Sequence, residues 1–416
     1  MSRPSARTVD LIVVGAGPAG LAAAIELRRL GATEVIAVDR ESEAGGIPRH
    51  ANHIGFGMRD LHRITTGPRY ARRYVDLAER AGVDVRTCTS VTGWANPTAL
   101  SLTSPAGIDM IAARAIVLAT GCRERPRSAR LIPGDRPLGV FTTGTLQQLV
   151  YLHHQRAGRR AVVIGAEHVS FSAVLTLAHA GAVTVAMVTE HPRHQTYAPY
   201  RWLSTGRLRV PILTSQRVTR IIGGRRVEAV ELTDVHTGAR RLLACDTVVV
   251  TGDWIPDHEL ARRGGLIMDP ATRAPRVDGA LRTSARGVFA AGNLIHAAET
   301  ADVAALSGRH VAQTVAAFLD RGQWPDSPSV PIGCRSPLRW VSPSAVSSAD
   351  PPPRRRFLWR VDAFVESAEL RIRQGRRVLF RNRYRHLVPT MPLRAPADWL
   401  PAVDLHGDAI TFELGD

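Results

Sequence analysis

The stretch TVDLIVVGAGPAGLAAAIELRRLGATEVIAVDR, residues 8–40, decides the fold. It opens with the apolar run Thr8–Val14, whose length and β-branched residues predict a buried strand. A glycine-rich turn follows, and then an apolar pattern with helical spacing over Leu21–Leu30. Glu34–Val38 predicts the next strand, and Asp39 follows it directly. The order strand, turn, helix, strand predicts a parallel βαβ unit.

The turn in this unit reads G-x-G-x-x-G. Glycine lets backbone approach a pyrophosphate closely, and the helix N-terminus that follows offers unpaired N–H groups and a favourable dipole. Asp39 comes 19 residues after the third glycine, where a carboxylate accepts hydrogen bonds from an adenosine ribose. The unit therefore predicts a dinucleotide-binding site. The three glycines of the pattern are Gly15, Gly17 and Gly20.

A similar strand–turn–helix–strand unit recurs at residues 161–190. It keeps the first glycine, Gly165, but Glu167 and Ser170 stand at the second and third glycine positions. A carboxylate at the second position would face a pyrophosphate, and its side chain would block close approach of the backbone. The sequence thus predicts a second dinucleotide-type fold and leaves binding of NAD(P) in doubt.

Further strands that end in Thr-Gly are predicted at residues 116–121 and 247–253. A strand within residues 283–293 precedes an amphipathic helix over residues 300–319, and the arginine-rich run 123–127 reads as a solvated loop between domains. The fold class is therefore α/β, with two Rossmann-like dinucleotide-binding domains and a small C-terminal domain. The expected divisions are the first part of the first domain at 8–135, the second domain at 136–246, the rest of the first domain at 247–324, a Pro/Ser-rich linker at 325–353 and a basic appended domain at 354–416.

All 54 basic side chains of the 416-residue chain are arginine, and lysine is absent. The chain therefore has no Schiff-base lysine and no phosphate-loop lysine, which argues against pyridoxal-phosphate enzymes, class I aldolases, kinases and P-loop NTPases. Arginine stays charged at any working pH and grips carboxylate or phosphate with two parallel hydrogen bonds.

The net charge of +17 is unevenly distributed. Residues 351–395 hold twelve arginines and three acids, a net charge of +9, whereas the last 21 residues hold five acids and no base. The basic stretch lacks a nucleic-acid recognition motif, so nucleic acid is the least favoured partner. A solvated basic face is the simplest interpretation, and docking to an acidic partner protein is the alternative.

The four cysteines, Cys88, Cys122, Cys245 and Cys334, are isolated and form no C-x-x-C pair. We therefore expect no metal site or iron–sulfur cluster built from this chain alone, and a reducing, cytoplasmic location. No apolar run approaches the roughly 18 residues that a membrane helix needs, and the short run before Gly15 does not read as a signal peptide.

Taken in order, the motifs resemble those of flavoproteins with two dinucleotide-binding domains, the pyridine nucleotide-disulfide oxidoreductase superfamily. The resemblance covers about residues 8–322 and implies that the first glycine turn binds FAD. It implies that the FAD pyrophosphate is held by Gly15, Gly17, Pro18, Ala19 and Gly20. Asn293 departs from the family's usual aspartate; it keeps an acceptor for the ribitol chain and loses the charge. Beyond the pyrophosphate turn, the resemblance implies FAD contacts from Asp39 at the adenosine ribose, Arg40 and the Val91 backbone at adenine, Gly46 in a double glycine, Thr120 and Gly121 at a Thr-Gly crossing, and Gly292 and Asn293 in the late FAD motif.

Thiol-disulfide members of this superfamily carry a redox cysteine pair just after the double glycine, here Gly45-Gly46. In this chain residues 47–57 read IPRHANHIGFG and hold no cysteine, which excludes disulfide reductase activity. The loop is similar to that of a subgroup containing flavoprotein subunits of bacterial opine and amino-acid dehydrogenases and of hydrogen cyanide synthase. Several of those relatives append a [2Fe–2S] domain, whereas the last 90 residues here hold only Cys334.

His50 and His53 in this loop are the candidate catalytic residues. Their distance from the double glycine implies a position beside the flavin, and imidazole suits the proton transfer that accompanies hydride transfer. The alternative is that one or both hydrogen-bond the pyrophosphate or nearby backbone.

The main functional hypothesis is an FAD-dependent oxidoreductase, a dehydrogenase subunit that moves hydride from an amine, imino or hydroxy acid to FAD and on to a partner. One alternative is an NAD(P)H-dependent reductase that uses the second domain. Another is an assembly subunit whose FAD is structural and whose arginine-rich C-terminal region binds an acidic protein or a second flavoprotein subunit.

Overall fold

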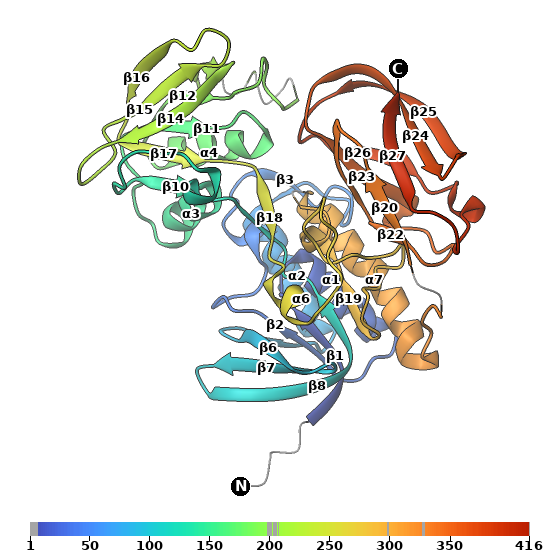
Figure 1. The fold of residues 1–416 in the computed structure, drawn as a ribbon. Helices are drawn as coiled ribbons and strands as arrows, with labels where there is room; N and C mark the ends of the chain where they lie inside the picture. The colour runs from blue at the N-terminus through green and yellow to red at the C-terminus, as the bar shows by residue number, and fades with distance from the viewer. Residues whose placement is uncertain are drawn as a thin grey trace.

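The computed structural model describes residues 7–197, 202, 206, 208–297, 299–326 and 329–415. Three units pack together in Figure 1. The central unit contains β1 (Arg7–Val14), α1 (Pro18–Arg29) and α7 (Ala301–Arg321), so it draws on both early and late parts of the chain. A second unit is built around β11 (Arg160–Ile164), and a C-terminal β unit around β24 (Val365–Gln374).

The sheet of the central unit brings the ends of four parallel strands to one edge. β1 lies between β2 and β8, with Val14 in register with both Val38 and Leu118. β19 pairs with β8 on the same side, where Ala290 is in register with Leu118. The turns after β1, β2, β8 and β19 therefore meet, as ligand sites do in parallel sheets. The strands, in sheet order, are β5 (Asp84–Arg86), β2 (Val35–Val38), β1, β8 (Gly107–Leu118), β7 (Ala99–Ser104) and β6 (Ser90–Asn96), with β19 (Val288–Ala290) added on β8.

Two helices of the central unit, α1 and α7, pack against each other at the glycine turn. A Cβ at Gly308 of α7 would lie 2.0 Å from the Ala19 carbonyl oxygen of α1, so only glycine allows this contact. The other regular segments of this unit are η1 (Ile47–Arg49), β3 (Ile54–Phe56), β4 (Thr65–Thr66), α2 (Gly67–Arg80), η2 (Arg127–Arg130), α6 (Glu259–Arg263), η5 (Gly292–Leu294) and the connecting ribbon of β9 (Cys122–Glu124) with β18 (Trp254–Pro256).

The second unit contains a five-stranded, all-parallel sheet, which confirms the α/β class with a second Rossmann-like fold. An antiparallel three-stranded sheet lies beside it. The parallel strands are β10 (Val140–Thr142), β17 (Thr247–Val250), β11, β12 (Val183–Val188) and β13 (Ile212–Leu213); the antiparallel strands are β14 (Gln216–Ile222), β15 (Ala229–Asp234) and β16 (Arg240–Ala244); the helices are α3 (Thr143–Gln147), η3 (Gln148–Leu152) and α4 (His168–His179).

The C-terminal unit starts earlier than the composition suggested. Residues 325–353 were expected to form a linker, but β20 (Val330–Cys334), β21 (Leu338–Ser342) and β22 (Ala345–Val346) lie within them. β20 pairs with β27 and β21 with β23, so these strands are parts of the same sheets as the basic C-terminal segment. The remaining elements are η6 (Pro353–Arg355), β23 (Arg356–Val361), β25 (Arg377–Leu387), β26 (Leu393–Pro396), η7 (Leu400–Ala402) and β27 (Ile410–Gly415).

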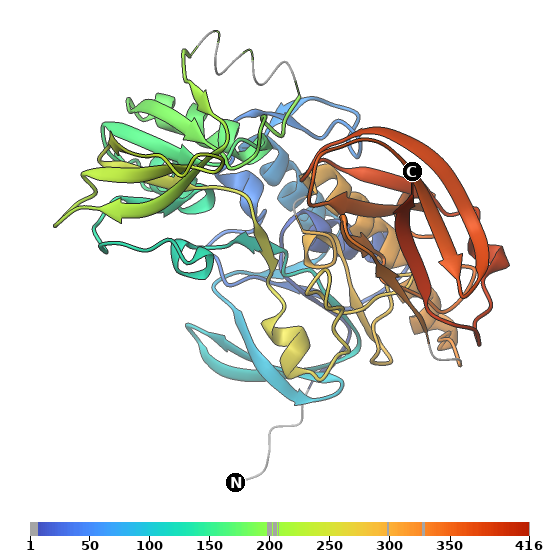
Figure 2. The ribbon, with the colours of Figure 1, turned by 45° about the horizontal axis from the view of Figure 1, so that its top comes forward.

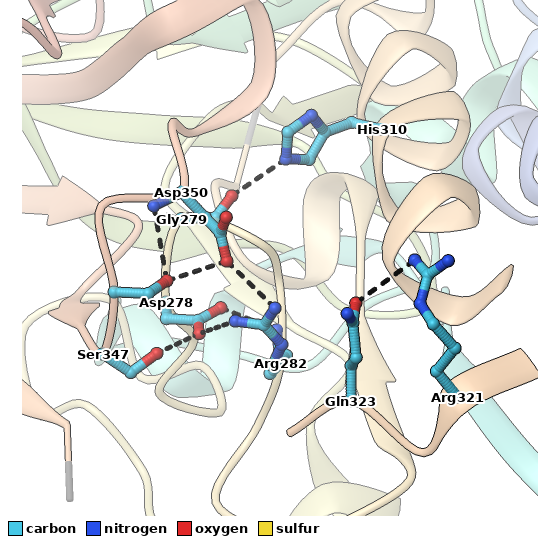
Figure 3. Close-up of polar contacts among 9 residues, drawn as sticks. Asp278, Gly279, Arg282, His310, Arg321, Gln323, Ser347 and Asp350 are labelled. Atoms are coloured by element: carbon cyan, nitrogen blue, oxygen red, sulfur yellow. Dashed lines mark hydrogen bonds and ion pairs between the residues drawn. The ribbon is translucent and has the colours of Figure 1, made fainter. Parts of the chain in front are cut away.

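A polar junction fastens the C-terminal unit to the central unit (Figure 3). Arg282 pairs with Asp278 at 3.1 Å and with Asp350 at 2.9 Å, and Ser347 donates to Asp278. Nearby, Nε2 of His310 on α7 lies 2.9 Å from the Gly279 carbonyl oxygen. Figures 1 and 2 also place the second unit and the C-terminal unit beside the same end of the central one.

Candidate functional site

The first glycine turn has the shape that a dinucleotide needs. Gly15 has a φ of +105°, and a Cβ there would lie 2.4 Å from the Ala119 carbonyl oxygen. Gly17 is the N-cap of α1, and no side chain caps the helix; Pro18 begins it. The N–H groups of the first turn therefore point outward without a side-chain acceptor, which suits a pyrophosphate.

The other predicted glycines gather around this helix N-terminus. A Cβ on Gly46 would lie 2.9 Å from the Gly17 Cα, so the double glycine touches the first turn. Gly292 has a φ of +70°, and a Cβ there would lie 2.5 Å from the Cβ of Ala19. Three motifs that are far apart in sequence thus enclose one site.

Asn293 provides the observation that most directly tests the fit of FAD. Its side-chain N–H donates to the Glu299 carbonyl oxygen at 2.9 Å, while its buried Oδ1 has no hydrogen-bond partner within the described residues. A buried acceptor without a donor is costly, by about 1–3 kcal/mol. A ribitol hydroxyl would satisfy it, so the residues present fit the sugar chain of FAD.

The adenosine contacts expected of Asp39, Arg40 and Val91 stay predictions. The Asp39 carboxylate caps the end of β2, accepting the Ala16 N–H at 2.8 Å and the Glu41 N–H at 3.0 Å. The Arg40 side chain is 70% exposed and lies 3.9 Å from the carboxylates of both Glu41 and Asp257. Val91 lies in β6, the edge strand.

Thr120 and Gly121 form the crossing between the central and second units. The Thr120 hydroxyl donates to the Asp257 carbonyl oxygen at 2.7 Å, and the Asp257 N–H donates to the Gly121 carbonyl at 2.9 Å. Gly121 has a φ of +77°, which favours glycine. The crossing is thus fixed to the return strand β18, whose ribbon with β9 leads to and from the second unit.

His50 is buried between the central and second units. It follows η1 directly, is 4% exposed, and its Nδ1 has no hydrogen-bond partner in the described part of the chain. Burial lowers the pKa of His50 to about 4; a contact with Gln147 of α3 partly opposes this, and the neighbouring Arg49 adds to it. The ring is therefore neutral at pH 7.

His53 also faces the second unit, three residues further along the loop. Its Nδ1 lies 2.9 Å from the Ile54 carbonyl oxygen, and its ring packs 5.1 Å from that of Phe56. Burial lowers the pKa of His53, and the bond to Ile54 partly opposes this. His168 of α4 also has a pKa lowered first by burial and then by the nearby His53. The two candidate histidines thus meet groups from the second unit.

The second glycine turn is filled by its own side chains. Gly165 has a φ of +137°, but a Cβ there would lie 2.6 Å from Oε2 of Glu167, and one on Gly252 would lie 2.7 Å from Oε1. Glu167 is only 7% exposed. Ser170, at the third glycine position, lies 2.6 Å from the Thr251 hydroxyl. The side chains of Glu167, Ser170 and Thr251 thus lie against the glycines of this turn, where binding of NAD(P) was in doubt from the sequence.

The chain after β12 also covers this turn. The Gln195 N–H donates to the Ala166 carbonyl oxygen at 2.9 Å, and Gln195 forms an isolated parallel bridge with Glu167. The Thr196 hydroxyl lies 2.8 Å from Nδ1 of His168. A segment that would border a bound nucleotide instead forms backbone bonds to the glycine turn itself.

Glu124 is a site residue that sequence reasoning missed. The run 123–127 looked solvated, but Glu124 is 7% exposed because β9 pairs with β18. One carboxylate oxygen accepts the Gly144 N–H at 2.8 Å, and the other has no partner among the residues described. Burial raises the pKa of Glu124, which the Gly144 bond opposes and nearby Glu167 reinforces. The burial of Glu124 was not visible in the sequence, because the arginines beside it indicate a solvated loop.

These features define a class of protein: a flavoprotein of two dinucleotide-type domains, in which the first has an open cofactor turn and the second a filled one. The chain belongs to the pyridine nucleotide-disulphide oxidoreductase family, whose model matches residues 9–308. The family is one of FAD-dependent oxidoreductases, whose members bind FAD and NAD(P)H. The match confirms the resemblance drawn from the motifs.

Curated relatives include subunits of multi-subunit oxidases. The alpha subunit of the sarcosine oxidase of Rhizobium meliloti (strain 1021) is 28% identical over 387 residues, which cover 88% of this chain and 36% of that relative. An opine oxidase subunit of Agrobacterium tumefaciens (strain Ach5) is 29% identical over 341 residues, covering 74% of this chain and 66% of that one. The chain thus spans about a third of the first relative and just under two thirds of the second.

Solved structures show the same fold. The thioredoxin reductase of T. acidophilum superposes with a TM-score of 0.63 at 22% identity, covering 75% of this chain and 98% of that one. None of the helices in the described part of the chain has the length and apolar run that a membrane span requires.

Proposed function

We propose that the protein is the flavin-carrying subunit of a dehydrogenase or oxidase that oxidises an amine, imino acid or hydroxy acid and passes the electrons to a partner. In this proposal NAD(P)H does not reduce the flavin. The names of the relatives support the substrate class and the subunit role, since sarcosine and opines are both secondary amines bearing carboxylates.

The filled second glycine turn carries the proposal. A nicotinamide dinucleotide would have to displace the Glu167 carboxylate, break the Gln195–Ala166 backbone bond and accept a negative charge beside its pyrophosphate. Two like charges at contact in a buried setting repel by several kcal/mol. These costs oppose NAD(P)H binding at the one place where this fold offers it.

The first unit supplies what a flavin dehydrogenase needs. FAD, when bound, accepts the hydride of the substrate. The chain's own residues would hold the FAD pyrophosphate at the N-terminus of α1, and Asn293 would accept a hydrogen bond from the ribitol chain. His50 is kept neutral by burial, and its unpaired Nδ1 accepts the proton that leaves the substrate's amine or hydroxyl group.

Anaerobic stopped-flow spectroscopy of the FAD-loaded protein tests this proposal. Oxidised flavins absorb at roughly 450 nm. We expect neither NADH nor NADPH to change the flavin absorbance at this wavelength. Dithionite serves as the positive control, because it bleaches any accessible flavin. A panel of N-substituted amino acids, imino acids and hydroxy acids then identifies the reductant. Rapid bleaching by either nicotinamide nucleotide would replace this proposal with the NAD(P)H-dependent reductase.

A second candidate is an assembly subunit whose FAD is structural. The observation that favours it is the exposed row Arg381, Arg383 and Arg385 on one face of β25, in the strand that ends its sheet. We propose an acidic partner protein or a second flavoprotein subunit for this face. The double variant Arg381→Glu/Arg385→Glu should lose a partner that co-purifies with the wild type while keeping its flavin. Retention of the partner at wild-type stoichiometry would exclude this face as the docking site.

A further inference from the structure

A concave surface lined by arginine lies where the C-terminal unit meets α7. Arg354 and Arg355 of η6, Arg356 at the start of β23 and Arg394 of β26 line it, and its volume is about 460 Å³. That volume lies within the range of about 300–1,000 Å³ that is usual for small-molecule sites. We call this surface the arginine pocket.

The backbone of the arginine pocket is strained in a way that presents these side chains. Arg354 and Arg355 have φ values of +59° and +55°, in the left-handed region that residues with a Cβ avoid. The conformation costs roughly 1–2 kcal/mol per residue. Hydrogen bonds from the Arg355 N–H to the Pro352 carbonyl and from the Ala397 N–H to the Arg355 carbonyl hold it in place. Such strain is concentrated at functional sites.

The positive charge of the pocket is mostly uncompensated. Among the described residues, only Arg355 of these four arginines has a carboxylate within 4 Å, that of Asp398, which also lines the pocket, at 3.7 Å. Across the described residues, Arg354, Arg356 and Arg394 have no ion-pair partner, and the buried Nε of Arg394 has no hydrogen-bond partner. Burial, and then the neighbouring Arg394, Arg356 and Arg59, lower the pKa of Arg354.

The pocket leads to a smaller buried cavity. This inner cavity of about 20 Å³ shares Arg354, Arg356 and Arg394 with the pocket and is bounded inside by His296 and Val303. His296 is 4% exposed, and its Nδ1 has no partner in the described part of the chain. The space holds about one water-sized group. His296 follows Asn293 of the late FAD motif by only three residues, so the inner cavity borders the segment that follows this motif.

We propose that the arginine pocket binds a small organic anion with at least two negative charges, either carboxylates or a pyrophosphate. Guanidinium groups match both chemistries, because their planar forks bind carboxylate and phosphate oxygens in pairs. The anionic groups pair with Arg354, Arg356 and Arg394 in the outer pocket, and one small group or a water reaches the Nδ1 of His296. This site goes beyond the proposed redox function, and the proposal assigns the bound anion no hydride transfer.

Isothermal titration of the FAD-loaded full chain with inorganic pyrophosphate and, separately, with citrate tests the site. We expect one of the two to bind at a stoichiometry of one, and acetate to bind at least tenfold more weakly. The anion that binds more tightly identifies the chemistry as phosphate or carboxylate. If neither binds at millimolar concentration, the proposal is wrong.

Variants assign the binding to these residues. Arg356→Gln/Arg394→Gln should weaken binding at least tenfold, whereas Arg381→Gln/Arg385→Gln on β25, which removes the same charge elsewhere, should change it by less than twofold. Equal losses of anion affinity in the two double variants would show that binding is non-specific charge attraction, and would overturn the site. Flavin absorbance checks folding. Should the first double variant fail to fold, Arg394→Lys replaces it, because lysine keeps the charge but removes the planar guanidinium fork. We then expect several-fold weaker binding of the anion. Wild-type affinity in Arg394→Lys would likewise overturn the site.

Discussion

His50 is the residue with the clearest chemical prediction. Its ring is neutral, buried and unpaired at Nδ1, and it follows the loop that touches the first glycine turn. His50→Asn should therefore keep FAD and slow flavin reduction by the substrate about 100-fold or more, the usual contribution of a general base. His53→Asn is the matched comparison, because that ring already bonds a backbone carbonyl. Rates equal to the wild type in both variants would remove the two histidines as catalysts.

The lowered pKa of His50 also predicts a pH dependence of stability. As the pH falls through 6.5 the unfolded imidazole takes up a proton, whereas the folded one stays neutral until about pH 4. The free energy of unfolding therefore decreases by about 3 kcal/mol in total as the pH falls across this window. Urea unfolding at pH 7 and pH 4 should show the wild type losing about this much more stability than His50→Asn. Parallel losses in the two proteins would contradict the assignment.

Sequence reasoning succeeded for residues whose role is set by local geometry. The glycines of the first turn need a close backbone approach, and this requirement is visible in the G-x-G-x-x-G pattern itself. Glu124 could not be found in this way. Its burial depends on β18, more than 120 residues away, while its sequence neighbours are exposed or half-buried arginines.

At the scale of elements, the late FAD motif provides a test of how the glycine loops fit together. Gly292→Ala would place a methyl group within 2.5 Å of the Ala19 Cβ and push the loop off α1. We expect FAD to be lost on gel filtration. Gly322→Ala is the control, because Gly322 has a similar φ of +64° at the end of α7 but meets only the end of the Arg286 side chain. Equal loss of FAD in both variants would attribute the effect to backbone strain alone.

Periodicity predicted the elements of the two dinucleotide folds, because each βαβ unit is built from neighbours in sequence. The strands within 325–353 were missed because proline and serine are typical of loops. Yet β20 tolerates Pro331, whose pairing partner lies in the two-residue strand β22. Its other neighbour, β27, lies nearly 80 residues further along, where no local pattern could reveal it.

At the scale of the whole molecule, one buried ion pair helps to hold the C-terminal unit on the flavin unit. Arg360 of β23 pairs with Glu299, and their side chains are 5% and 2% exposed. Arg360→Leu should destabilise the protein by roughly 3–5 kcal/mol, because it leaves a buried carboxylate unpaired. Adding Glu299→Gln should restore part of the loss, as measured by urea unfolding. An Arg360→Leu variant as stable as the wild type would show that the pair contributes nothing to this attachment.

The side chains and backbone that lie over the second glycine turn also determine how nucleotides affect the stability of the protein. A nucleotide-binding domain normally gains stability from its ligand in proportion to the logarithm of the free concentration. Here the Glu167 side chain lies against Gly165 and Gly252, and the Gln195 N–H bonds the Ala166 carbonyl oxygen, and we propose that they keep a nucleotide out. The melting temperature should therefore rise with added FAD but stay constant as NAD⁺ or NADP⁺ is raised to millimolar levels, and a nucleotide-dependent rise would contradict the closed turn. Changes in the cellular concentration of nicotinamide nucleotides would then not change the fraction of this protein that is folded.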